Sequence, residues 1–143
     1  MTFDDILKDT NCDCFKETFE DNESLFARKI NKPIPFDKDF ASHWERGKRA
    51  ENCKEICGYK GLSINLWNET TKNDVIEKFL TTFSITPKHK DSIFVLKFLP
   101  QAGVVKHTPN KHDETHFDFY KSDDFSLDML ENHNIIHLKN FIK

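Results

Sequence analysis

The densest group of chemically competent side chains lies in the stretch 107–118, where three histidines and two aspartates fall within twelve positions. These residues are His107, His112, Asp113, His116 and Asp118. An imidazole beside a carboxylate can act as a general acid or base, and such a group also resembles a hydrolytic metal site in content. The spacing does not match a metal signature such as H-E-x-x-H. Three readings stay open: a polar strand with a solvated loop, a metal site, and metal-free catalysis by His107, His116 and Asp118.

The alternation of residues 116–120 predicts a strand with two different faces. His116, Asp118 and Tyr120 would share one face, and Phe117 and Phe119 would point into the core. An imidazole, a carboxylate and a phenol on one wall are suitable groups for proton transfer.

Ser63 and His43 are the residues that we expect to complete such a catalytic group from across a cleft. Ser63 lies in the run 62–67, whose alternation predicts a half-buried strand. His43 lies in the stretch 40–46, which predicts a short helix. Together with the histidine-rich group, these residues support a hydrolase, or a nucleic-acid- or nucleotide-processing enzyme, as the alternative function.

The four cysteines form two close pairs, Cys12 with Cys14 and Cys53 with Cys57. Two such pairs brought together by folding are a usual way to build a tetrahedral zinc site. Neither pair has the common two-residue spacing, and 38 residues lie between Cys14 and Cys53. The sequence therefore favours free thiols, and the alternatives are a structural zinc that staples a binding domain together, and disulfides.

A short basic stretch, Arg46, Lys48 and Arg49, follows Trp44. Cations beside an aromatic ring can contact phosphate while the ring stacks on a base. Glutamates dilute the stretch, however, and the formal net charge of the chain is −3. Cations near a helix end also complement the helix dipole. A nucleic-acid partner is therefore an alternative that the sequence does not favour.

The elements that must position these residues are predicted from apolar periodicity. Strands are predicted at 62–67, 93–99, 104–107 and 116–120. The stretch 71–86 has the apolar period of a helix, and residues 125–142 predict one or two further helical segments. We therefore expect an α+β fold, with a small, mostly antiparallel sheet of about four strands packed against two or three helices.

Phenylalanine accounts for 14 of the 18 aromatic residues, which favours burial in a core or in an apolar interface. We expect a single domain over residues 1–143, in which the irregular segment 1–38 wraps the domain or faces a partner. The residues that we expect to contact a partner are Phe15, Phe19, Phe26, Phe36 and Trp44. The function that the sequence favours is a small intracellular module that binds another protein.

The first residues are acidic and lack the basic and apolar regions of a secretory signal. The apolar run 93–99 is much shorter than the ~20 residues of a membrane helix. We therefore expect a cytoplasmic protein without a membrane partner, in a compartment where cysteines are usually reduced.

Three short motifs carry a resemblance to small uncharacterised bacterial proteins. They are Gly61-Leu62-Ser63-Ile64-Asn65, the segment Val104-Val105-Lys106-His107-Thr108-Pro109, and Thr115-His116. The resemblance spans roughly residues 40–120, and the chain departs from it in an acidic loop after Pro109. It implies a stand-alone intracellular bacterial protein, an accessory component of a defence or conflict system. No activity follows from it, but it draws attention to His43, Ser63, His107 and His116 as a shared pocket or core.

Overall fold

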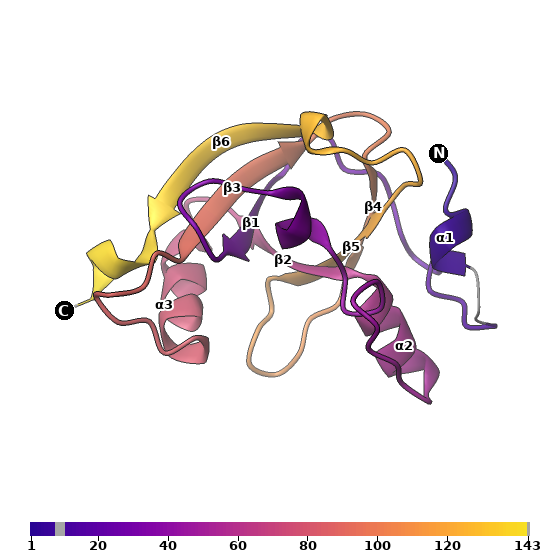
Figure 1. Ribbon diagram of the computed structural model, residues 1–143, viewed down its shortest axis with the longest axis horizontal. Coiled ribbons are helices and arrows are strands. Elements are labelled where there is room, and N and C mark those ends of the chain that lie inside the picture. Colours follow the sequence, from indigo (N-terminus) through magenta and orange to yellow (C-terminus); the bar gives the residue numbers. More distant parts are fainter. Residues whose placement is uncertain (8–10, 143) are drawn as a thin grey trace.

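A six-stranded antiparallel sheet forms the body of the structure, in the order β4-β5-β2-β1-β3-β6 (Figure 1). The computed structural model describes residues 1–7 and 11–142. The strands are β1 (Leu25–Ile30), β2 (Leu62–Trp67), β3 (Ser92–Phe98), β4 (Gly103–His107), β5 (His116–Lys121) and β6 (Leu130–His137). The α-helices are α1 (Asp4–Leu7), α2 (Cys53–Lys60) and α3 (Lys72–Thr82). Short 3-10 helices cover Asp37–Phe40, Leu127–Met129 and Leu138–Phe141. The α+β class is confirmed, with two strands more than expected.

The sheet curls around one of its own faces. On a flat sheet, strands three places apart lie about 14 Å from each other. The rings of Phe98 on β3 and Phe119 on β5 nevertheless stack with their centroids 4.0 Å apart, although β1 and β2 lie between those strands. Phe26 and Ile64 are fully buried in the same cluster. The concave face of the sheet therefore encloses an apolar core, and much of the packing in it is between strands of this same sheet.

Helices α2 and α3 lie on the convex face, with the loop 108–115 between them (Figure 1). Val75 and Phe79 of α3 pack on Ala27 and Val95, which point away from the concave core. At the other end of the sheet, the Tyr120 hydroxyl donates to the carbonyl of Cys57 in α2 over 2.9 Å. Within the described part of the chain, every helix is too short or too polar to cross a membrane.

Four of the six strands lie within one residue of their predicted bounds, because each has a clear alternating or continuous apolar pattern. Helix α3 also begins where its period predicts but ends at Thr82, four residues early. The predicted helix at 40–46 is wrong. The chain there forms a 3-10 turn in which the backbone N–H of Phe36 donates to the Asp39 carboxylate over 2.7 Å, followed by a turn.

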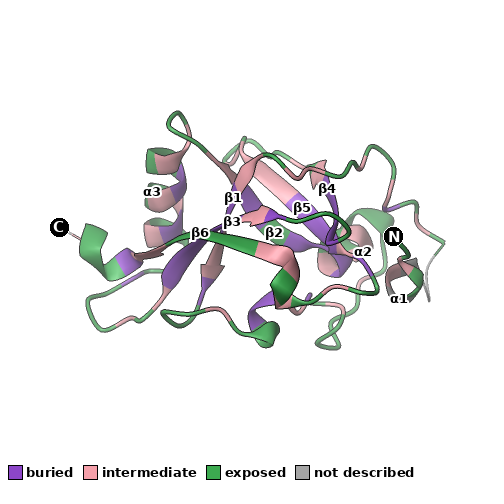
Figure 2. Ribbon diagram, turned by 90° about the horizontal axis from the view of Figure 1, so that it is seen from above, coloured by how far each residue is buried: buried purple, intermediate pink, exposed green. Residues whose placement is uncertain are grey.

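The two unexpected strands replace an irregular segment and a helix. β1 lies within residues 1–38, where Arg28 and Lys29 interrupt the apolar pattern of a strand that pairs on both sides. β6 replaces the predicted C-terminal helices, and its residues are half exposed and half of intermediate burial (Figure 2). Its backbone pairs with β3 over the whole length of β3, and this long-range pairing prevails over the helical spacing of its apolar residues.

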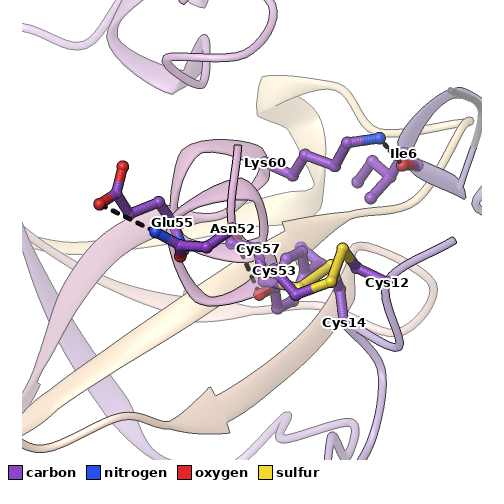
Figure 3. The surroundings of a disulfide bond; sticks show 9 residues. Ile6, Cys12, Cys14, Asn52, Cys53, Glu55, Cys57 and Lys60 are labelled. Carbon is purple, nitrogen blue, oxygen red and sulfur yellow. Dashed lines mark hydrogen bonds between the residues drawn. A yellow bond between two sulfur atoms is a disulfide. The ribbon is translucent and has the colours of Figure 1, made fainter. Parts of the chain in front are cut away.

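The four cysteines form two disulfides, Cys12–Cys53 and Cys14–Cys57, with sequence separations of 41 and 43 residues (Figure 3). The expectations of free thiols and of a structural zinc are therefore wrong, because no thiolate is left to bind a metal. Both bridges tie the segment after α1 to α2, and Cys14 packs with Val104 and Tyr120. The N-terminal segment thus wraps the β4–β5 end of the sheet.

The residues expected to contact a partner differ in exposure. Phe26 is fully buried, so its assignment to an interaction surface is wrong. Phe15 packs between Phe3 and Tyr120. The ring of Trp44 lies under two cations, Arg49 at 4.1 Å and Lys60 at 4.6 Å. Phe19 and Phe36 are 47% and 40% exposed, so they are the most exposed of the five, although the Lys32 ammonium lies over the Phe36 ring at 5.0 Å.

Candidate functional site

The sheet opens where β1 and β2 separate, and a cavity forms at this opening. The two strands pair only from Leu25 with Trp67 to Ala27 with Asn65. Beyond that point the Arg28 side chain bridges the gap. Its Nη1 donates to the Ser63 carbonyl over 2.8 Å, and its Nε donates to the Asp39 carbonyl over 2.7 Å. The cavity has a volume of about 620 Å³ and is bordered by β1, β2, β5, α2, α3 and the segment 38–46.

Ser63 and His116 meet at this cavity. Ser63 pairs directly with Asp118 across the β2–β5 ladder, so His116 is its diagonal neighbour on the same face. The Ser63 Oγ lies 3.1 Å from Nε2 of His116. Ser63 is exposed and His116 is half-buried, so the hydroxyl is the more accessible of the two groups.

Thr108 fixes the protonation of the imidazole. Nδ1 of His116 lies 2.8 Å from the Thr108 hydroxyl and 3.1 Å from the Thr108 carbonyl oxygen. Because a carbonyl oxygen only accepts, we assign the proton to Nδ1. The lone pair of Nε2 then faces the Ser63 hydroxyl as an acceptor. The arrangement Ser63–His116–Thr108 has the logic of a nucleophile, a base and a group that orients the base.

Burial keeps this imidazole neutral. It lowers the pKa of His116, and the charge of Lys78 lowers it further, against an opposing hydrogen bond to the Thr108 carbonyl. Behind Thr108 lies the buried carboxyl of Asp118, whose pKa burial raises to about 7. The Thr108 hydroxyl and Lys106 favour its charged form. At neutral pH the base is therefore unprotonated and ready to accept a proton.

A polar network holds the loop 108–115 against the sheet. The amide nitrogen of buried Asn65 donates to both oxygens of Asp113, over 2.9 and 3.0 Å, and to Thr115. Lys78 of α3 forms an ion pair with Asp113 at 2.5 Å. The Lys78 contact and the Asn65 hydrogen bond lower the pKa of Asp113 against the effect of burial. The loop that supplies Thr108 is therefore attached to both β2 and α3.

Positive charge dominates the cavity wall. Of the described residues that line it, five carry cationic side chains and one, Asp39, is acidic. The cations are Arg28, Lys29, Lys38, Arg46 and Lys78. On the α3 side, Phe79 and Phe83 add an apolar border.

The structure brings together only part of the residue set expected from the sequence. Ser63, His116 and His43 line one cavity, with His43 packed edge-on against Tyr59. Asp118 lies beneath them, where it does not line the cavity. His107 lies on the other side, because its ring stacks on Phe117 of the concave face and its Nε2 contacts the Glu114 carbonyl. The part of the chain that the structure describes contains no group of three metal-ligating side chains.

Sequence reasoning missed Thr108, Asn65, Lys78 and Arg28 as parts of the site. One of them, Asn65, had a readable signal. Ser63 and Asn65 are the polar residues of the alternating run 62–67, so they had to share the face opposite the core. Thr108, Lys78 and Arg28 had none, because the pairing of β2 with β5, the position of α3 and the pairing of β1 are set by long-range packing.

Comparison of the chain with protein-family models, curated protein sequences and solved structures finds no match.

Proposed function

We propose that the chain is a serine hydrolase that cleaves an ester in the cavity between β1 and β2. The observation that carries this proposal is the Ser63 Oγ at 3.1 Å from the unprotonated Nε2 of His116, with Nδ1 held by Thr108. These groups lie on a paired sheet and border a cavity large enough for a small substrate. Their relative geometry needs no rearrangement before reaction.

In the proposed reaction, His116 Nε2 takes the hydroxyl proton while Ser63 Oγ attacks the ester carbonyl. A C–O bond to serine forms, and the bond to the leaving alkoxide breaks as His116 returns its proton to that oxygen. Water then adds to the acyl-serine with the same base and releases the acid and free serine. Cations line the wall, Lys78 and Arg28 among them, and their charge would stabilise negative charge on the carbonyl oxygen.

Labelling with a fluorophosphonate tests the proposal. Attack by Ser63 forms an O–P bond and expels fluoride, and the added mass is read by intact mass spectrometry. We expect one label on the natural chain, none on Ser63→Ala, and labelling at least about 100-fold slower for His116→Ala. Exposed Ser126 provides the matched control, because Ser126→Ala keeps the label if Ser63 is the target. Labelling that survives Ser63→Ala would refute the proposal.

A protein-interaction module is the second candidate, and exposed apolar residues on the segment between β1 and the 3-10 turn favour it. Ile34 is 56% exposed and Phe36 is 40% exposed. A photoreactive residue in place of Phe36 would crosslink a partner, whereas the same residue in place of Phe141, which is 42% exposed, would not. Equal crosslinking from both positions would count against a specific docking surface.

The two disulfides bear on the compartment in which either function would operate. Disulfides persist in oxidising compartments and are rare in the reducing cytosol. The pairing of all four cysteines therefore favours an oxidising compartment over the cytoplasm that the sequence predicts.

A further inference from the structure

The cations of the cavity are not equally neutralised. Lys29 forms an ion pair with Asp91 at 3.0 Å, and Lys78 pairs with Asp113. Asp39 is the acid that interacts with Arg28. Among the described residues, Lys38 and Arg46 form no ion pair with a carboxylate. Two of the five positive charges on the wall are therefore uncompensated.

Arg46 also lies close enough to other cations to influence them. Among the residues that the structure describes, its guanidinium donates to the Ala41 carbonyl alone, over 3.1 and 3.3 Å. After burial, the charge of Arg46 is the largest cause that lowers the pKa of Arg28 to about 10. The pKa of His43 is likewise lowered by burial and by the charges of Lys48, Arg46 and Arg28. Like charges held together without a counterion repel each other, so an anion that enters here relieves repulsion as well as gaining contacts.

We infer that this cationic wall, formed by Arg46, Lys38 and Arg28, binds a phosphate group, and that the cavity takes a substrate that carries a phosphate. Two uncompensated positive charges match the charge of a phosphomonoester dianion better than that of a carboxylate. Arginine forks suit phosphate oxygens, which accept several hydrogen bonds at once. The inference deepens the proposed hydrolase function and depends on it for the cleavage step, but not for binding.

The layout of the cavity gives the rest of the substrate a place. Four of the cations come from the segment 38–46 and from β1, whereas the α3 side supplies the apolar edge of Phe79 and Phe83 together with Lys78, which is paired with Asp113. Ser63 and His116 contribute from β2 and β5. A phosphate on the cationic wall therefore leaves an apolar part of the same molecule room near α3, with the reactive pair beside it.

Titration of inorganic phosphate into ¹⁵N-labelled protein, followed by NMR, tests the site without any catalytic step. We expect saturable shifts of amides that border the cavity, and about tenfold weaker affinity in Arg46→Gln. Arg49→Gln is the matched control, because Arg49 is also exposed and donates to a backbone carbonyl but does not line the cavity. We expect less than a twofold change for this variant. Lys38→Gln and Lys54→Gln form a second matched pair, because each removes one positive charge and exposed Lys54 lies on α2.

The outcomes separate the inference from the proposed function. Unsaturable shifts, equal losses in Arg46→Gln and Arg49→Gln, or acetate binding as tightly as phosphate would each overturn the phosphate site. The titration is repeated on Ser63→Ala, which is expected to bind phosphate as the natural chain does. Phosphate binding without fluorophosphonate labelling would leave the site standing and overturn the hydrolase. Labelling without phosphate binding would support the hydrolase and overturn the phosphate site.

Discussion

Removing the two disulfides should show that their contributions to the free energy of unfolding are not independent, because both close nearly the same loop. The chain-entropy account assigns about 4 kcal/mol to a bridge that closes 41 or 43 residues. Once one bridge is present, the other closes a much smaller ring. Cys12 and Cys14 lie two positions apart, and Cys53 and Cys57 four, so that ring contains about eight residues and is worth about 2.5 kcal/mol.

We therefore expect each single removal to lower the free energy of unfolding by about 2.5 kcal/mol, and removal of both to lower it by about 6.5 kcal/mol. The combined loss exceeds the two single losses by about 1.5 kcal/mol. The variants are Cys12→Ala with Cys53→Ala, Cys14→Ala with Cys57→Ala, and all four together. Alanine suits the site because Cys14 is buried among apolar residues, and this burial should make its pair the costlier one.

Urea unfolding under non-oxidising conditions measures all three variants beside the natural chain. The denaturant slope should rise most in the variant without bridges, since only its unfolded chain expands fully. Single losses near 4 kcal/mol that add without coupling would refute the shared-loop reasoning. The natural chain treated with a reductant should match the variant without bridges, apart from the packing of the thiols.

Three further predictions concern the site and its protons. Because burial lowers the pKa of His116, ester cleavage should be lost as the pH falls through a midpoint below 6.5, and a midpoint above 7 in a pH–rate profile would contradict a neutral base. The pKa of Asp118 is about 7 in the folded chain, so folded protein keeps a proton that unfolded chains release near pH 4, and stability falls as the pH rises between these values. In urea unfolding, the free energy of unfolding of Asp118→Asn should therefore lie about 4 kcal/mol above that of the natural chain at pH 8, and this excess should be about 3 kcal/mol smaller at pH 5. An excess that does not change with pH would disprove the raised pKa. Asp113→Ala removes the carboxylate to which Asn65 and Lys78 both donate and should cost about 2–3 kcal/mol at pH 7, while a loss below 0.5 kcal/mol, roughly the effect of an ordinary surface substitution, would show that the network does not anchor the loop.

The local sequence pattern was sufficient to predict the helix and the strands whose buried residues follow a regular period. β2, β3, β5 and α3 bury a continuous or periodic apolar face, and each lies where its periodicity predicts. β1 and β6 could not be read in this way. β1 carries Arg28 and Lys29 because it borders the cavity, and β6 is a polar edge strand whose conformation depends on pairing with β3.

The site was less predictable than the fold because its geometry comes from partners that are distant in sequence. The alternation at 116–120 correctly places His116 and Phe117 on opposite faces of β5, but it does not predict which strand pairs with β5. His107 illustrates the same limit, since it belongs to a pair with Phe117 on the concave face. The cysteine pattern was misjudged for another reason. Spacing alone does not distinguish a metal cluster from two parallel bridges, and the choice depended on the assumed compartment.

The register of β5 against β2 links reactivity to the integrity of the core. A shift of one residue would turn Phe117 and Phe119 outward and carry His116 into the apolar interior, away from Ser63. A variant that loosens this register therefore loses burial and the Ser63–His116 contact in the same event. A well-packed core is therefore enough to keep positions 63 and 116 side by side on one face of the sheet, whichever side chains occupy them.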